Sequence, residues 1–405
     1  MVPTMRAVES AVTEPSSIQT QSSLTRKIAA ACIVAAGFFL VAILGSTTFT
    51  DQVASRRDFI QYWAAAQQLV HRGNPYDAEA ILRLEQGAGM PGSIPHFSFS
   101  PPVGLALTAP LAYLRPGRAF LLWTMLELGC LALSAWMLWR LFDRRDNRLH
   151  LLVFAFAPAL SCEYYGQLGI FLLLFLTLFL VWHRAYPTLA GAALLPFILK
   201  PHLVLPLAVV LVLWSARERT WRILAGFAVA FMACSALSFH YDPGAWAQYR
   251  LSMSANSDLA YGFLPTLSAL LQSVIAPSAR WVAFIPEAAA CAWAAWYYLI
   301  HRTCWNWVEH GLLVLLVAFV CAPYAWFMDE SILFPAILLG MYAAQKNRRR
   351  LLPVFVAGTF AAIEVIASVP TNRWYFLWTP AAWLAWYLYA TRWPTYERVS
   401  PGPAI

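Results

Sequence analysis

The segment "SRRDFIQYWAAAQQLVHRGNPYD", residues 55–77, is polar and aromatic in a chain that is otherwise mostly apolar. From position 59 the apolar residues recur at 59, 62, 63, 66, 69 and 70, which is the spacing of one helical face. Gly73 and Pro75 predict the end of this helix, with Gly73 as its left-handed stop. Asp77 predicts the cap of a second helix, "AEAILRLEQ". We expect both helices to lie on a membrane surface, with the aromatic face of the first helix toward the lipid.

Asp58 stands immediately before the first of these helices, and two interpretations of it are open. Aspartate is a good N-cap residue, and Asp58 with Gln61 fits the capping-box pattern. A carboxylate beside arginines and aromatic residues at a membrane surface also suits a general base. The two roles are compatible, because a cap would also fix the position of the carboxylate.

The composition indicates a multi-pass membrane protein. Hydrophobic residues make up 60% of the chain and charged residues only 12%, whereas soluble domains carry about 25% charged residues. The net charge is +8 without a long basic run, so no nucleic-acid partner is expected. The seven cysteines are scattered and include no CxxC pair, which argues against a disulfide framework or a zinc site. We predict no metal site and no cofactor.

The apolar runs predict about twelve transmembrane helices. They cover approximately residues 28–49, 119–141, 150–162, 167–183, 187–199, 201–215, 222–240, 279–300, 310–328, 330–345, 351–368 and 374–391. The first run has a long polar lead-in, so an uncleaved helix is favoured over a signal peptide. Lysine and arginine gather in alternate loops, which predicts a cytoplasmic tail at each end, residues 1–27 and 393–405, around one membrane domain, 28–392.

The same rule predicts two large extracytoplasmic loops, 50–118 and 241–278. A span at 101–114 would move the arginine-rich 143–148 loop to the outside. We therefore expect residues 101–114 to form an amphipathic or re-entrant helix in the outer interface.

Five segments in order along the chain carry a family resemblance. They are "RDFIQYWAAAQQLVHRGNPYD" (57–77), "FSFSPPVGLALTAPLAYL" (97–114), "GQLGIFLLLFL" (166–176), "LKPHLVLP" (199–206) and "APYAWFMDESILFPAIL" (322–338). This set resembles glycosyltransferase family 87, a GT-C-type membrane family that includes polyprenyl-phosphate-mannose-dependent mannosyltransferases and related arabinosyltransferases of cell-envelope assembly. The resemblance implies an all-α polytopic membrane protein with a GT-C-like fold and amphipathic juxtamembrane helices in its long first extracytoplasmic loop.

The resemblance also implies an activity. A hexose, mannose by family likeness, would move from a polyprenyl-phosphate donor to a lipid or glycan acceptor of the cell envelope, at the extracytoplasmic face of the plasma membrane and with inversion. The chain shows no DxD motif and no glycine-rich phosphate loop, which agrees with a lipid donor rather than a nucleotide sugar. In such a family the first-loop aspartate is the proposed base, and Asp58 matches that position.

The substrate-binding candidates are cations, aromatic residues and one further carboxylate. They are Arg57, Tyr62, Trp63, Lys200, His202, Tyr324 and Asp329. Lys200 and His202, on either side of Pro201, are favoured for the donor phosphate. Asp329 is expected to hold a sugar hydroxyl or an arginine, or to cap a helix. For the other cations headgroup snorkelling is the alternative, and for the aromatic residues an interfacial belt.

Two other functions stay open. A transporter would favour inverted repeats and interrupted helices near the membrane midplane, but no convincing repeat is present and the polar residues crowd one face. An envelope ligase or polymerase using a diphosphate lipid donor would work on the same face as the transferase. Glu127, Glu287 and Glu364 lie within predicted spans; helix-to-helix hydrogen bonds or function would explain them, and we leave them outside the site.

Overall fold

The computed structural model describes residues 49–96, 98–142, 148–255, 266–345, 352–369 and 373–392, and within these ranges the chain is helical, with no strand. Both predicted tails and nearly all of the first predicted span lie outside the described residues. In chain order the helices are α2 (Asp51–Ala54), α3 (Phe59–Val70), α4 (Ala78–Gly87), α5 (Pro102–Thr108), η1 (Ala109–Tyr113), α6 (Pro116–Leu141), η2 (Leu149–Ala155), α7 (Ala157–Tyr165), α8 (Gly169–Trp182), α9 (Pro187–Ala193), η3 (Leu195–Leu199), η4 (Pro201–Leu203), α10 (Leu205–Glu218), α11 (Trp221–Tyr241) and α12 (Ala245–Ala255). They continue with α14 (Leu267–Ile275), η5 (Arg280–Phe284), α15 (Ile285–His301), η6 (Trp307–Gly311), α16 (Leu312–Cys321), η7 (Phe327–Leu333), α17 (Phe334–Gln345), α18 (Leu352–Ala367), η8 (Arg373–Trp378) and α19 (Thr379–Thr391).

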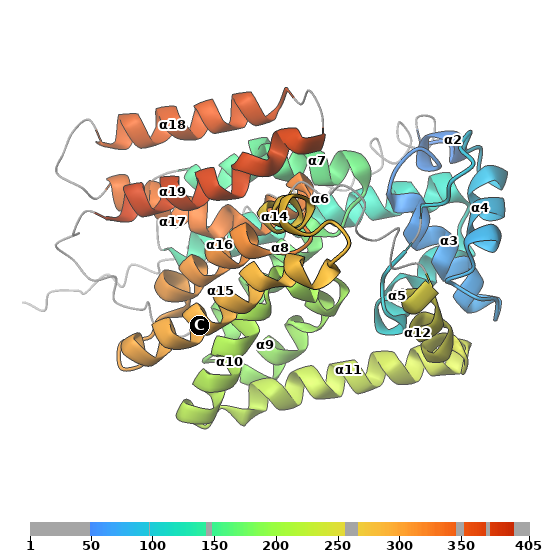
Figure 1. Ribbon diagram of the computed structural model, residues 1–405, viewed down its shortest axis with the longest axis horizontal. Helices are drawn as coiled ribbons and strands as arrows, with labels where there is room; N and C mark the ends of the chain where they lie inside the picture. Colours follow the sequence, from blue (N-terminus) through green and yellow to red (C-terminus); the bar gives the residue numbers. More distant parts are fainter. Residues whose placement is uncertain are drawn as a thin grey trace, which may run out of the picture.

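The first loop forms a compact group of helices at one end of the molecule, where α2, α3, α4 and α5 lie together beside α12 (Figure 1). The aromatic face of α3 is buried inside the protein. Phe59 packs against Phe120 of α6 with ring centroids 5.1 Å apart, and Tyr62 stacks on Trp123 of α6 at 5.4 Å. The expectation that this face meets lipid is therefore wrong, because α6 supplies its own row of aromatic partners.

The ends of the two first-loop helices only partly follow the predictions. Asp77 caps α4, because its side chain accepts hydrogen bonds from the N–H groups of Glu79 and Ala80. The left-handed residue after α3 is Arg72, with φ 58°, and not Gly73. Asp58 makes no side-chain cap bond to α3. Its backbone is already helical, with φ −60° and ψ −22°, whereas a capping residue typically adopts the extended region.

Residues 101–114 form α5 and η1, which together are far shorter than the ~20 residues that cross a bilayer. This segment packs under α3, where Trp63 Nε1 donates to the carbonyl of Leu114 at 2.9 Å. Val103 and Leu105 of α5 are fully or almost fully buried. Most of the segment therefore packs against protein, while Leu107 and Tyr113 are 44% and 69% exposed.

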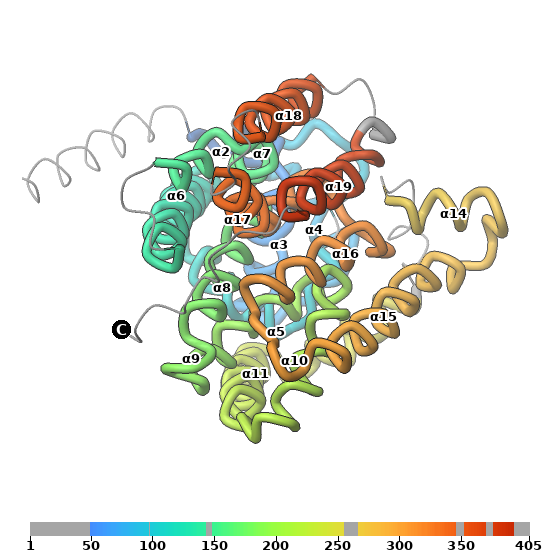
Figure 2. Tube along the Cα trace, turned by 90° about the vertical axis from the view of Figure 1, so that its left-hand side faces the viewer, coloured from blue at the N-terminus to red at the C-terminus, as the bar shows by residue number. Residues whose placement is uncertain are grey.

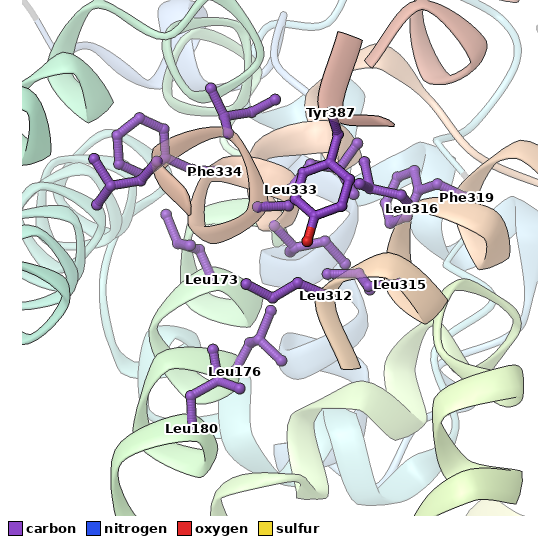
Figure 3. Packing of buried hydrophobic residues seen from close by; sticks show 14 of the residues in the cluster. Leu173, Leu176, Leu180, Leu312, Leu315, Leu316, Phe319, Leu333, Phe334 and Tyr387 are labelled. Carbon is purple, nitrogen blue, oxygen red and sulfur yellow. The ribbon is translucent and has the colours of Figure 1, made fainter. Parts of the chain in front are cut away.

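The main bundle is organised around α8, α16, η7, α17 and α19. Figure 3 shows leucines of α8 and α16 gathered with the rings of Phe334 and Tyr387 in one apolar cluster. The continuous apolar stretch Phe327–Gln345 is 89% buried over its most apolar window. The central helix of the bundle is thus also the one that carries Asp329 near its start.

At the outside of the bundle, α11 has only 17% of its apolar window buried. Its outward residues include Val229 and Met232, each 59% exposed, which is typical of a helix that faces lipid. On its other side α11 contacts α9 so closely that a Cβ atom at Gly191 would lie 1.8 Å from the carbonyl oxygen of Ile223. A Cβ atom at Gly226 would lie 1.9 Å from the carbonyl oxygen of Thr188. Small residues at a helix crossing of this kind are common in membrane proteins.

The prediction of twelve spans is not confirmed. Among the described residues three helices are long and apolar enough to cross a membrane, Pro116–Leu141, Trp221–Tyr241 and Phe327–Gln345, and shorter apolar helices accompany them. Several predicted spans are divided: 150–162 becomes η2 followed by α7, and 187–199 becomes α9 followed by η3. The predicted boundary at 328–330 is wrong, because α16 ends at Cys321 and the next helical stretch begins at Phe327. The apolar helices are consistent with a multi-pass membrane protein.

Candidate active site

A four-residue turn, Gly166 to Gly169, joins α7 to α8 and lies between the first loop and η7. Gly166 has φ +68°, and a Cβ atom there would lie 2.7 Å from the Cβ atom of Phe59. A Cβ atom at Gly169 would lie 2.5 Å from the carbonyl oxygen of Met328. Glycine fits both positions because it has no side chain and tolerates positive φ. The turn therefore brings two segments that are far apart in sequence against Gln167, the first of the two residues between its glycines.

Gln167 links Asp58 to Tyr62. Its Nε2 donates to Oδ2 of Asp58 at 2.8 Å, and its Oε1 accepts from the hydroxyl of Tyr62 at 3.0 Å. Burial, together with the nearby Tyr324 and the carboxylates, raises the pKa of Tyr62 well above its ordinary value, so its hydroxyl keeps its proton. Since a tyrosine hydroxyl donates here and an ionised carboxylate can only accept, the orientation of the amide is fixed. One oxygen of the half-buried Asp58 is thereby held, and the other accepts no hydrogen bond from the described residues.

Cys162 of α7 contacts the backbone of this turn and of the start of α8. Its thiol donates to the carbonyl of Gln167, with Sγ and O 3.2 Å apart, and its sulfur accepts from the N–H of Ile170 at 3.4 Å. Oε1 of the buried Glu127 lies 3.8 Å from the same sulfur. These contacts fix the backbone that carries the Gln167 amide.

A second polar group lies at the break between η3 and η4 and at the start of η7. Nζ of Lys200 lies 2.5 Å from Oδ1 of Asp329, and both side chains are buried. Oδ2 of Asp329 accepts from the N–H of Trp326 at 3.1 Å, and the N–H of Asp329 donates to the Trp326 carbonyl at 2.9 Å. Asp329 was expected to hold a sugar hydroxyl or an arginine, or to cap a helix; its carboxylate binds a lysine and the first N–H group at the start of η7.

Two aromatic rings complete this second group. His202 and Tyr324 meet edge to face with centroids 5.0 Å apart, and Trp326 Nε1 donates to the Tyr324 hydroxyl at 3.0 Å. Nε2 of His202 is buried and has no hydrogen-bond partner among the described residues. Leaving such a group unpaired costs about 1–3 kcal/mol, so a ligand atom is expected opposite it.

The two polar groups lie near each other. Tyr62 lies within electrostatic range of Asp58, Asp329 and Tyr324, and Tyr324 lies within range of Lys200 and Asp58. Six of the eight predicted residues are thus brought together, namely Asp58, Tyr62, Lys200, His202, Tyr324 and Asp329.

A match to a known protein family shows which class of enzyme the chain belongs to. The sequence model of glycosyltransferase family 87 matches residues 99–331, which is more than half of the 405 residues. The chain belongs to glycosyltransferase family 87. It is therefore a glycosyltransferase, in a family of membrane enzymes that depend on polyprenyl-phosphate sugars. No curated protein and no solved structure gives a match.

The family match covers only part of the candidate site of this family 87 enzyme. It contains Gln167, Lys200, His202, Tyr324 and Asp329 but begins after Asp58. The catalytic assignment of Asp58 therefore depends on the first-loop resemblance and on its contact with Gln167, which lies inside the matched range.

The two remaining predicted residues have other surroundings. Arg57 places its guanidinium 3.6 Å from the centre of the Tyr164 ring, which is a cation–π contact on α7. Trp63 is almost fully buried and uses its indole N–H on the Leu114 carbonyl. Arg57 thus lies beside Asp58 with its guanidinium in no hydrogen bond to any described residue, while Trp63 holds the α5–η1 segment in place.

The sequence analysis did not predict a role for Gln167, although this residue lies in the segment 166–176 that resembles the family. An amide side chain between two glycines at the start of a helix was the feature that could have indicated it. It also missed a pair in the first loop. Glu85 is fully buried and accepts the N–H of His96 with both oxygens, at 3.2 and 3.1 Å. Nδ1 of His96 lies 3.5 Å from Glu85 Oε1. The Glu85 carboxylate raises the pKa of His96, and the charge of Asp58 adds to that shift, which places His96 near the site.

Two of the three carboxyl groups left outside the predicted site connect helices of this family 87 enzyme. Glu127 joins α6 to Cys162 of α7, and Glu364 of α18 accepts from the N–H of Ala157 at the start of α7. For Glu287, Oε1 is buried without a partner among the described residues. The described part of the chain also contains no group of three His, Cys, Asp or Glu residues placed to hold a metal ion.

Proposed function

We propose that this protein transfers mannose from a polyprenyl-phosphate donor to a lipid or glycan acceptor of the cell envelope. The reaction takes place at the extracytoplasmic face of the plasma membrane. The acceptor hydroxyl attacks the anomeric carbon, the bond from that carbon to the phosphate oxygen breaks, and the phosphate leaves with the electron pair. In-line displacement inverts the anomeric centre, so a β-linked donor gives an α-linked product.

The observation that carries this proposal is the state of Asp58. Its carboxylate is half-buried, is held on one oxygen by the Gln167 amide, and is not used as a helix cap. A base must keep an oxygen available for the proton it removes. Asp58 keeps one, and we assign it the proton of the acceptor hydroxyl.

The departing phosphate needs positive charge. Arg57 is adjacent to Asp58 and makes a contact with the Tyr164 ring that leaves its N–H groups for a ligand. Lys200 has three N–H donors, of which Asp329 takes one. We assign the phosphate to Arg57 and Lys200, with Asp329 fixing the position of the lysine.

The sugar is assigned to the aromatic part of the site. His202 offers a buried Nε2 without a partner in the described residues, and the ring of Tyr324 lies against it. A sugar hydroxyl opposite Nε2 would satisfy that nitrogen. Tyr62 acts through Gln167 rather than on the sugar, because its hydroxyl is already used.

The test is a transfer assay on membranes that contain the protein. Radiolabelled polyprenyl-phosphate mannose is compared with the glucose donor, with GDP-mannose and with a polyprenyl-diphosphate sugar, and the anomeric configuration of the product is determined. The proposal expects label in a lipid or glycan product from the monophosphate mannose donor, with inversion, and none in membranes carrying Asp58→Asn. Label from the diphosphate donor alone would establish the ligase alternative, and product of retained configuration would exclude the displacement described above.

A further inference from the structure

A cavity of about 400 Å³ lies far from the candidate active site. Its lining comes from the end of α10 and from the connections after α8, after α10 and after α15, and includes Arg184, Glu218, Thr220, Arg302 and Trp305. Helix α10 separates the two places: Lys200 precedes its start, and Glu218 is its last residue. Fourteen helical residues span about 21 Å at 1.5 Å per residue. Figure 2 looks toward this end, where α9, α10, α11 and α15 come together.

The lining is cationic. Arg184 and Arg302 are both exposed, and among the described residues neither has a carboxylate within salt-bridge distance. The acidic member of the lining, Glu218, has the guanidinium of Arg217 3.7 Å from its carboxylate. The cavity therefore presents two guanidinium groups that are not neutralised by the described part of the chain.

The cavity also has uncharged hydrogen-bonding groups without partners. Trp305 is 7% exposed, and its indole N–H donates to no described residue. The hydroxyl of Thr220 is likewise buried and unpartnered within the described ranges. Thr220 is the first residue before α11, a helix of 21 residues whose N-terminal turn receives no side-chain cap from it. Buried donors without a partner indicate that a ligand atom belongs opposite them.

We propose that this cavity binds a phosphate group, and that its source is the headgroup of an anionic phospholipid. Guanidinium groups, an indole N–H, a hydroxyl and the start of a helix are together the chemistry that binds phosphate oxygens. Basic pockets between transmembrane helices are known lipid-headgroup sites.

The neighbours of the cavity favour a lipid over a free anion. Tyr186 precedes Pro187 of the lining and is 50% exposed, and Trp221 follows Thr220 and is 55% exposed. Exposed tyrosine and tryptophan at helix ends lie at the level of lipid headgroups. The volume lies within the range of about 300–1,000 Å³ of small-ligand pockets, which admits a glycerophosphate group while the acyl chains stay outside.

The experiment measures binding to the purified full chain in a nonionic detergent. Three probes are titrated: dioctanoyl phosphatidylglycerol, dioctanoyl phosphatidylcholine and inorganic phosphate. The variant Arg184→Gln/Arg302→Gln removes the two cavity cations, and Arg140→Gln/Arg148→Gln is the matched control, because it removes two exposed arginines that do not line the cavity. Since all four arginines are exposed, the variants are expected to fold, and thermal unfolding checks this.

The expected result is saturable binding of phosphatidylglycerol, weakened about tenfold or more by the cavity variant and less than about twofold by the control. Phosphatidylcholine should bind much more weakly. Trp305→Phe keeps the ring but removes the N–H, and it should weaken phosphatidylglycerol binding several-fold. If inorganic phosphate binds with the same arginine dependence and the lipid does not, the phosphate site stands and the lipid source is wrong. Equal loss in both double variants, or wild-type affinity in the cavity variant, would overturn the site.

Discussion

Asp58 and Asp329 are two aspartates of the candidate active site, and their surroundings differ. Asp329 is fully buried, bound to the Lys200 ammonium and to a backbone N–H, so its charge is satisfied within the protein. Asp58 is half-buried, and the described residues offer it one hydrogen bond, from the neutral Gln167 amide.

The difference indicates separate roles for identical side chains. A carboxylate whose charge is already paired is a poor proton acceptor, and removing its partner leaves an uncompensated charge in the interior. A carboxylate that is oriented but only partly satisfied can take a proton from a substrate. Variants of the two aspartates should therefore fail in different ways: Asp58 in catalysis and Asp329 in folding.

The largest expected effect is on turnover in Asp58→Asn. Removal of a general base typically lowers the rate by about 10²–10⁴-fold, so transfer should nearly vanish. Thermal unfolding should hardly change in Asp58→Asn, because the asparagine oxygen can still accept from the Gln167 amide. Asp58→Ala should be equally inactive and about 1–3 kcal/mol less stable, because it leaves the buried Gln167 amide without its acceptor. Turnover with radiolabelled donor and unfolding in detergent are measured on the same preparations. If Asp58→Asn kept more than about a tenth of the wild-type turnover, the loss would be too small for a general base, and Asp58 would only position its neighbours.

The buried pair gives the second prediction. Lys200→Ala should destabilise the protein by about 3–5 kcal/mol, because Asp329 would keep a buried charge without its partner. The double variant Lys200→Met/Asp329→Leu removes both charges and should recover much of that stability while transfer stays lost. Thermal unfolding of the single and double variants decides this. If Lys200→Ala unfolds like wild type and loses only donor use, Lys200 is a free phosphate ligand and the comparison with Asp58 fails.

Gln167 tests whether orientation matters for Asp58. Gln167→Leu removes the hydrogen bond to a charged group, which is worth about 1.5–3 kcal/mol, so kcat should fall about tenfold or more while the KM for the donor changes little. Tyr62→Phe is the matched control, since it keeps the amide but removes the hydroxyl that holds its far end; its effect should be smaller. A rise in KM with unchanged kcat would instead make Gln167 a substrate-binding residue.

The parts of the fold that sequence could predict are local. The periodicity from Phe59 gives α3, and Asp77 caps α4 because its partners are two and three residues away. The predicted cap at Asp58 failed because its partner, Gln167, lies 109 positions along the chain. The Lys200–Asp329 contact spans 129 positions. No pattern within one segment contains such partners, so the residues of the site could be named while their contacts could not.

The predicted count of twelve spans is not confirmed, for a related reason. Hydropathy detects apolar runs, but prolines and short 3₁₀ turns divide several of them, as in α9 followed by η3 with Pro196. Burial also cannot be read from hydropathy. The stretch Phe327–Gln345 and helix α11 are both apolar, yet 89% of one apolar window is buried and 17% of the other. Packing against neighbours, which the sequence does not show locally, decides which of them faces lipid.

The smallest expected effect concerns the pH dependence of stability and the Glu85–His96 pair in the first loop. The Glu85 carboxylate raises the pKa of His96, so the folded protein holds the imidazole proton more tightly than the unfolded chain does. That contribution to stability is fully present below the ordinary histidine pKa of about 6.5, and it is lost as the pH rises through the raised value of the folded state. His96→Asn and Glu85→Gln should each remove this loss of stability with rising pH. The double variant should remove no more than either alone, because the two groups act as one pair.

Melting temperatures of the wild type and the three variants across this pH range give the measurement. If the melting temperature of Glu85→Gln depends on pH as steeply as that of the wild type, a charge other than Glu85 raises the pKa of His96. Asp58 is the other negative charge that raises this pKa, and Asp58→Asn then tests it in the same way.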